Sequence, residues 1–157
     1  MAVTETRDEQ LTRNVSELLQ ELRVAQGGVQ FLFGFLLAVA FTEHYARASG
    51  LEQVVHLVAV VFATASVACL TAPAAWHRLL FRHGRRPQIL QAANRLTVAG
   101  LAFLAVSMTA TVFLLFEVVA GIAVGIVVTA VFAVTFGALW FVLPLRIRLN
   151  GEHPPPK

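Results

Sequence analysis

Charged residues are scarce in this chain and are confined to a few short segments. Asp, Glu, Lys and Arg make up 13% of its 157 residues, whereas a soluble domain usually carries about 25%. Between Leu96 and Leu145 the only ionisable side chain is Glu117. A soluble domain needs polar groups over much of its surface, and this stretch has too few to provide them. The sequence, with 57% hydrophobic residues and a mean hydropathy of +0.72, therefore predicts an integral membrane protein.

Cysteine and the common catalytic motifs are also missing or nearly so. The single cysteine, Cys69, excludes an internal disulfide and a thiolate metal site, and we interpret it as a small buried hydrophobe. No Walker loop, GxGxxG, HExxH or nucleophile elbow occurs. The first 14 residues are polar and form no apolar signal-peptide core. These absences predict a protein that is not an enzyme and that carries no cofactor.

What is present is a set of long apolar runs. About 20 apolar residues cross a bilayer as a helix, and these runs lack the alternation of barrel strands. The longest run requires two helices, and Gly121, which follows Glu117, is the natural place for the turn between them. The sequence thus predicts an all-α, up-down helical bundle of four transmembrane helices. The expected spans are about 24–42, 54–75, 96–116 and 122–145.

The segments outside the spans are polar. We expect residues 1–13 and 150–157 to be disordered tails around a membrane domain of residues 14–149. Asn14 and Glu17 have the spacing of a capping box. The apolar residues that follow recur at i, i+3, i+4 and i+7, which predicts an N-terminal amphipathic helix. That helix either lies on the membrane surface or packs against the basic loop, and Gly27–Gly28 is a natural bend into the membrane.

Positive charge lies almost wholly on one side of these spans. Every Lys and Arg except Arg47 falls in the two terminal segments or in the loop between spans two and three. The positive-inside rule therefore places both termini and this loop in the cytoplasm. Pro73 is expected to kink span two, and Gly84 and Pro87 to end one helix and begin the next. This pattern predicts a helical hairpin of spans two and three that extends into the cytoplasm.

Two groups of polar residues lie at membrane depth or at its edge. The first consists of Gln26, Gln30, Asn94 and Thr97. These residues either line a pore or cavity or form hydrogen bonds between helices, with Asn94 and Thr97 as partners of the glutamines. Serine and threonine residues elsewhere are expected to bond their own helix backbones.

The second group is expected at the outer ends of the helices. It comprises Glu43, His44, Glu52, His56 and Glu117. Such a layer could bind a transition metal, attract cations or sense pH through histidine, or it could simply be solvated at the interface. No metal-ligand set is assigned. His56 is the best single candidate for a functional role, because it lies about one turn inside the apolar run.

The loop between spans two and three forms a cluster of basic and aromatic residues. Much of its charge is expected from membrane insertion alone. Clusters of this kind also bind anionic lipid head groups or protein partners, whereas a short loop against the membrane is a poor reader of nucleic acid. The candidate contact residues are Trp76, His77, Arg78, Arg82, Arg85 and Arg86.

Three segments of the chain, ELRVAQGGVQFLFGFLLAVAFTE, PAAWHRLLFRHGRRPQIL and AANRL, resemble a family of small four-span membrane proteins common in actinobacteria, a domain of unknown function. The resemblance covers about residues 14–145. It implies the four-span fold and a location in the bacterial plasma membrane, and it implies no catalytic residue.

Two functions remain open from the sequence. The first is an oligomeric channel or transport protein for ions or small solutes, with the pore between subunits of a homo-oligomer. The alternative is a structural or accessory membrane protein that binds anionic lipid or a larger membrane complex through its basic hairpin.

Overall fold

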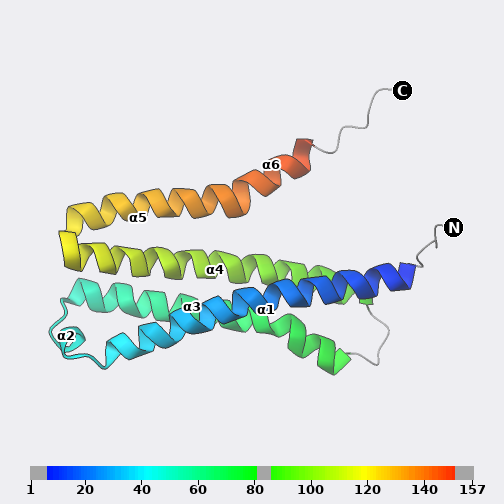
Figure 1. The fold of residues 1–157 in the computed structure, drawn as a ribbon, viewed down its shortest axis with the longest axis horizontal. Coiled ribbons are helices and arrows are strands. Elements are labelled where there is room, and N and C mark those ends of the chain that lie inside the picture. The colour runs from blue at the N-terminus through cyan, green and yellow to red at the C-terminus, as the bar shows by residue number, and fades with distance from the viewer. Residues whose placement is uncertain (1–6, 81–85, 151–157) are drawn as a thin grey trace.

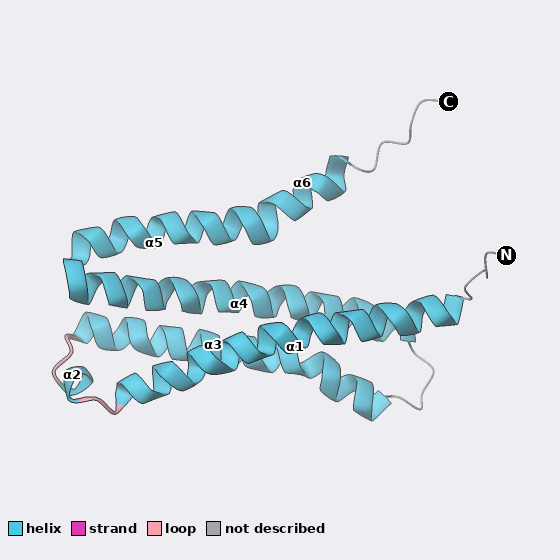
Figure 2. Cartoon of the chain, in the orientation of Figure 1, coloured by secondary structure: helices cyan, strands magenta, loops and turns pink. Residues whose placement is uncertain are grey.

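The computed structural model describes residues 7–80 and 86–150, and every regular element within them is a helix (Figure 2). Among these residues, four helical stretches are long and apolar enough to cross a membrane. Each overlaps one of the expected spans, and the break before the fourth lies at Gly121 as predicted. The stretches are Leu22–Ala40, Gly50–Trp76, Ala92–Ala120 and Ile122–Leu149.

The main helices lie lengthwise beside one another (Figure 1). The start of α1, the end of α6, the end of α3 and the start of α4 all lie at one end, which we call the basic end. The short helix α2 and the turn between α4 and α5 lie at the other, which we call the α2 end. In chain order the elements are α1 (Arg7–Ala40), α2 (Glu43–Ala46), α3 (Gly50–Leu80), α4 (Arg86–Ala120), α5 (Ile122–Gly137), the π-helical segment η1 (Ala138–Val142) and α6 (Leu143–Asn150).

The N-terminal helix begins earlier than expected and is continuous. Residues 7–13 are helical rather than disordered, and Asn14 lies inside α1 instead of capping it. An i,i+4 ion pair between Arg13 and Glu17, at 3.7 Å, supports this stretch. The helix also passes through Gly27 and Gly28 without ending, so the amphipathic segment and the first span form one element. The tail residues 1–6 and 151–157 lie outside the described residues.

Three helices, α1, α3 and α4, build the buried core. Leu22 and Val29 of α1 pack with Leu70 of α3 and Leu104 of α4. A second cluster joins Leu36 of α1 to small residues of α3. In lipid, the hydrophobic effect does not drive helices together. Small side chains instead let the helices approach closely and make van der Waals contacts. The interhelical contacts are most extensive between α3 and α4.

The fourth span lies on the outside of this core. Among the three core helices, α5 makes its extensive contacts with α4. Beyond α5 the chain passes through η1, and α6 then turns away from the core (Figure 1). Pro144, the second residue of α6, lacks a backbone N–H and so cannot bond to the carbonyl of Trp140 in η1, which accounts for the local change of helical pairing. The sequence predicts that all four spans pack into one bundle. For the fourth span this stays a prediction.

Candidate functional site

Gln26 connects α1 to α3 beside a proline. Its Nε2 donates a hydrogen bond of 2.7 Å to the carbonyl oxygen of Leu70. Pro73 lies in the next turn of α3 and removes the backbone donor that would serve the carbonyl of Cys69, the residue before Leu70. The Gln26 bond is therefore made beside this gap, to the neighbouring carbonyl, and does not replace the missing donor. Gln26 thus pairs with α3, and the expectation that Asn94 or Thr97 would be its partner is wrong.

The other three candidates for a pore do not meet in the single chain. Gln30 is exposed on α1 and Asn94 is exposed on α4. The hydroxyl of Thr97 donates to the carbonyl oxygen of Ala93 in its own helix, at 2.9 Å. Any joint action of these residues would therefore need a second copy of the chain.

His56 is buried inside the chain at the α2 end. Only 3% of its surface is exposed, and its Nε2 lies 2.9 Å from the carbonyl oxygen of Leu36 in α1. Because a carbonyl can only accept, Nε2 carries a proton and donates. The ring of Tyr45, on α2, lies 4.7 Å away between centroids. His56 Nδ1 is buried without a hydrogen-bond partner, so this residue links α3 to α1 and is not a solvated interfacial group.

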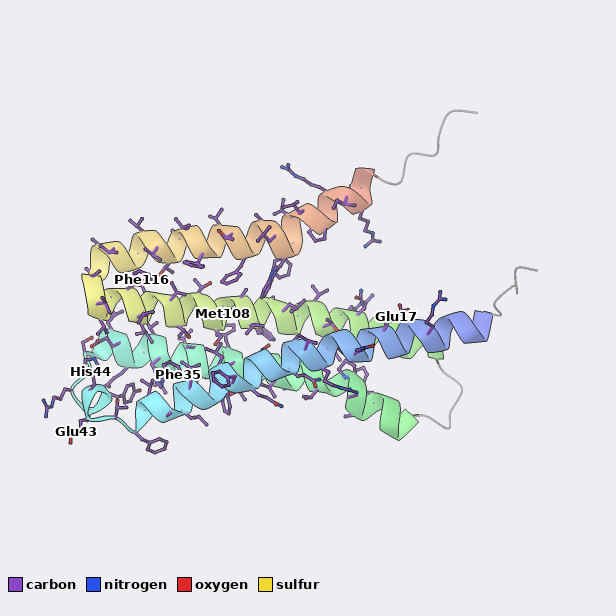
Figure 3. The ribbon with its side chains drawn as sticks, in the orientation of Figure 1. Glu17, Phe35, Glu43, His44, Met108 and Phe116 are labelled. Atoms are coloured by element: carbon purple, nitrogen blue, oxygen red, sulfur yellow. The ribbon has the colours of Figure 1, made fainter. Side chains whose placement is uncertain are left out.

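The remaining acidic and histidine residues of α2 and α3 have separate roles. Glu43 and His44 are exposed on α2 (Figure 3), and Glu43 lies 3.8 Å from the exposed Arg47. Glu52 and Ser49 form a reciprocal capping box at the start of α3, in which the backbone N–H of each donates to the side-chain oxygen of the other. The structure does not gather three His, Cys, Asp or Glu side chains into a metal-binding group in residues 7–80 and 86–150.

Glu117 lies at the turn between α4 and α5. Gly121 has a φ of 88° and reverses the chain, a conformation that residues with a side chain rarely adopt. At Gly125 a Cβ atom would lie 3.2 Å from the backbone nitrogen of Glu117, so the two helices touch here. The Oε2 atom of Glu117 is buried and has no hydrogen-bond partner. This carboxyl group thus differs from the exposed side chains of Glu43 and His44 in having a buried oxygen atom.

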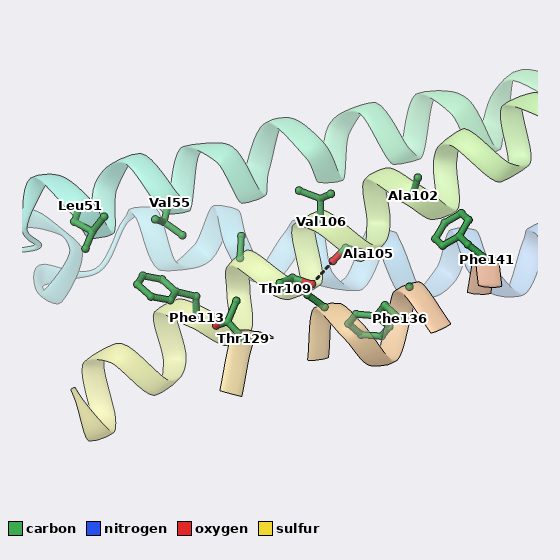
Figure 4. A pocket seen from close by; sticks show the side chains of 13 residues that line it. Leu51, Val55, Ala102, Ala105, Val106, Thr109, Phe113, Thr129, Phe136 and Phe141 are labelled. Carbon is green, nitrogen blue, oxygen red and sulfur yellow. Dashed lines mark hydrogen bonds between the residues drawn. The ribbon is translucent and has the colours of Figure 1, made fainter. Parts of the chain in front are cut away.

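An apolar groove of about 590 Å³ lies between α3, α4 and the α5–η1 stretch (Figure 4). The hydroxyl of Thr109 donates to Ala105 in its own helix, whereas Thr129 Oγ1 is buried without a partner. Near the basic end, Phe136 and Phe141 line the groove. The ring of Phe136 packs against that of Trp140 in a tilted arrangement, with 5.1 Å between the ring centroids. The other wall residues are Leu51, Val55, Ala102, Val106, Ala110, Phe113, Ala133 and Gly137.

The basic cluster is only partly described. The indole of Trp76 is 37% exposed at the end of the second span. Helix α4 begins at Arg86, so Pro87 occupies the first turn as predicted. Arg82, Arg85 and the expected helix end at Gly84 lie outside the described residues, as do the side chains of His77, Arg78 and Arg86.

Two buried serines make interhelical contacts, so the expectation that they bond their own helix backbones is wrong. Ser66 donates to the carbonyl oxygen of Gly100 at 2.8 Å, and Ser107 donates to that of Ala59 at 2.9 Å. Both serines are fully buried and bond across α3 and α4 rather than to their own helices. The signal for them is the spacing of Ala59, Ala63 and Ser66, which places three small residues on one helix face.

The chain belongs to a family of unknown function (DUF6328), whose model matches residues 4–144. This match confirms the resemblance to an uncharacterised family. Comparisons with curated proteins and with solved structures find no match.

Proposed function

We propose that this member of the DUF6328 family is a structural or accessory membrane protein that binds anionic lipid through its basic hairpin and does not conduct solutes within one chain. The observation that supports this proposal most directly is that polar side chains inside the protein form hydrogen bonds between helices. Gln26, His56, Ser66 and Ser107 each pair with a backbone carbonyl of a neighbouring helix.

These pairings favour a static core over a conducting one. A polar hydrogen bond between membrane helices stabilises by about 0.6 kcal/mol on average, and four of them also specify how the helices are aligned. A conduction path requires polar groups that face water instead. Within the three-helix core, the polar side chains of Gln26, Ser66 and Ser107 are engaged with backbone atoms. The core around them consists of apolar residues such as Leu22, Val29 and Leu70.

The charge distribution supports lipid binding at the basic end. Among the described residues, every arginine except Arg47 lies on α1, α3, α4 or α6, each of which has one of its ends there. Each basic residue close to an anionic membrane surface contributes about 1 kcal/mol to its attraction. In this proposal the basic end faces the cytoplasm of a bacterial cell, and the α2 end faces outward.

A lipid-dependent stability measurement tests this function. We would reconstitute the protein in phosphatidylcholine vesicles with and without phosphatidylglycerol and follow thermal unfolding. The expected result is a higher melting temperature with the anionic lipid, and a smaller difference in the triple variant R82Q/R85Q/R86Q. Arg47→Gln, at the opposite end, is the matched control and should leave the difference unchanged. Equal melting temperatures for the wild type in both lipids would refute the proposal.

A pore between copies of the chain is the second candidate, and one observation favours it. Gln30 is exposed on the first span, on a face that points away from the core of the protein. Its amide has no hydrogen bond to the described part of the chain. Copies arranged around this face would bring the amides together. Solute flux into liposomes distinguishes the two functions: we expect flux equal to that of empty vesicles. Flux that is abolished by Gln30→Leu would replace the main proposal with a channel.

A further inference from the structure

Two of the buried polar atoms that lack partners lie at or beside the apolar groove. The hydroxyl of Thr129 is part of the groove wall and does not bond its own helix, unlike that of Thr109 across the groove. Glu117 follows the wall residue Phe113 by one helical turn toward the α2 end. Its Oε2 atom is the other unpartnered one, and the residue is half-buried.

The groove has the form of a slot along the helices. Its α4 wall extends from Ala102 to Phe113, which corresponds to about 16 Å at the helical rise per residue. It lies between α3 and the α5–η1 stretch, and the aromatic residues Phe136 and Phe141 line it toward the basic end. In the orientation that crosses a membrane, this slot is parallel to the lipid chains.

We propose that the groove binds one acyl chain of a phospholipid whose head group carries a primary ammonium, with that ammonium held by Glu117 at the α2 end. This site is independent of the proposed function, which concerns the opposite end of the molecule and anionic lipids rather than a zwitterionic one.

The chemistry of the two unpartnered groups selects this ligand. A carboxyl oxygen accepts hydrogen bonds, and a primary ammonium offers three N–H donors with a favourable charge. An acceptor buried without a donor is unfavourable. The Oε2 atom of Glu117 is covered by protein atoms, so in this proposal the side chain turns toward the end of the groove, where a bound ammonium supplies the missing donor. An anionic head group would instead meet a carboxyl group. Phosphatidylethanolamine fits these requirements, and phosphatidylcholine, whose nitrogen carries no N–H, does not.

The position of Thr129 agrees with the same lipid. Gly125 touches Glu117, and Thr129 follows it by one turn on the same face of α5. The backbone of Thr129 therefore lies about 6 Å deeper along the helices than that of Glu117. The ester carbonyls of a phospholipid also lie between its head group and its chains. The hydroxyl of Thr129 is thus placed to donate to an ester oxygen while the chain fills the groove.

Quenching of Trp140 tests the proposal. The ring of Trp140 packs against that of Phe136 in the groove wall. The chain has two tryptophans, so a Trp76→Phe variant leaves Trp140 as the only one. The protein would be reconstituted in phosphatidylcholine vesicles containing small fractions of phosphatidylethanolamine or phosphatidylcholine with brominated acyl chains. We expect the ethanolamine lipid to quench at a roughly tenfold lower fraction, the factor that about 1.4 kcal/mol represents. Equal quenching by the two lipids would overturn the role of the ammonium.

Three variants separate the parts of the site. Glu117→Gln should remove the difference between the two lipids and keep the quenching by either. Ala133→Leu places a larger side chain in the groove and should abolish the preferential quenching. Ala130→Leu, on the same helix at a position that does not line the groove, should preserve it. Preferential quenching that survives Ala133→Leu would overturn the groove as the binding site. Thermal unfolding of each variant verifies that the fold is retained.

Discussion

Gly100 is the position at which the contact between α3 and α4 can be tested most directly. A Cβ atom added there would lie 2.8 Å from both Cγ and Cδ2 of Leu70 and 3.2 Å from Cβ of Cys69. Leu70 is fully buried and packed in the core, so its side chain has little room to move away. The carbonyl of Gly100 also accepts the hydrogen bond from Ser66, so any separation of the helices weakens that bond.

The magnitude follows from two opposing effects of Gly100→Ala. Overpacking a well-packed core costs about 1–3 kcal/mol, while replacing glycine by alanine inside a helix gains about 0.5–1 kcal/mol. Gly34→Ala is the matched control, because a Cβ atom at Gly34 has no neighbour within 4 Å. It receives the helical gain without the clash. The free energy of unfolding of the two variants should therefore differ by about 1–3 kcal/mol, with Gly100→Ala the less stable.

Unfolding by sodium dodecyl sulfate in mixed micelles, followed by circular dichroism, measures this difference. A double-mutant cycle adds a sharper criterion: Leu70→Ala should be less destabilising in the Gly100→Ala background than in the wild type, because the new methyl group occupies part of the space that leucine leaves. Equal stabilities for Gly100→Ala and Gly34→Ala, or additive effects in the cycle, would refute the close packing described at this position.

Three further substitutions report on other contacts in the same unfolding assay. Gln26→Leu removes an interhelical hydrogen bond and should destabilise by about 0.6–1.7 kcal/mol, whereas Gln30→Leu, on the exposed side of the same helix, should not; the same loss in both variants would contradict the pairing. His56→Leu should cost a similar amount, because it leaves a backbone carbonyl of α1 without the imidazole donor, and an unchanged free energy of unfolding would show that this bond is not made. Gly121→Ala should destabilise by about 1–3 kcal/mol, because its backbone conformation is strained for any residue with a Cβ atom; a neutral effect would indicate a different turn.

The sequence predicts which residues of the candidate site are unusual. It does not predict which atoms those residues contact. His56 and Glu117 stand out as polar groups in apolar runs, and both prove to have a buried atom without a partner. The metal-binding alternative for the outer residues finds no group of three ligands among the described residues, and Glu52 instead caps the start of α3. The groove has no signature in the sequence, since its wall consists mostly of ordinary apolar residues, with Thr109 and Thr129, from α3, α4 and the α5–η1 stretch.

The sequence by itself determined the membrane class, the number of apolar helices and the place of the turn at Gly121. These properties depend on local hydropathy and on the length needed to cross a bilayer, both of which can be read along the chain. Only the tertiary structure decided that Gln26 faces α3 while Gln30 faces outward. Lipid is as apolar as the protein core, so a membrane helix that is apolar all round carries no period that marks its buried face. The faces are set instead by close contacts such as that between Gly100 and Leu70, which exist only once the helices have packed.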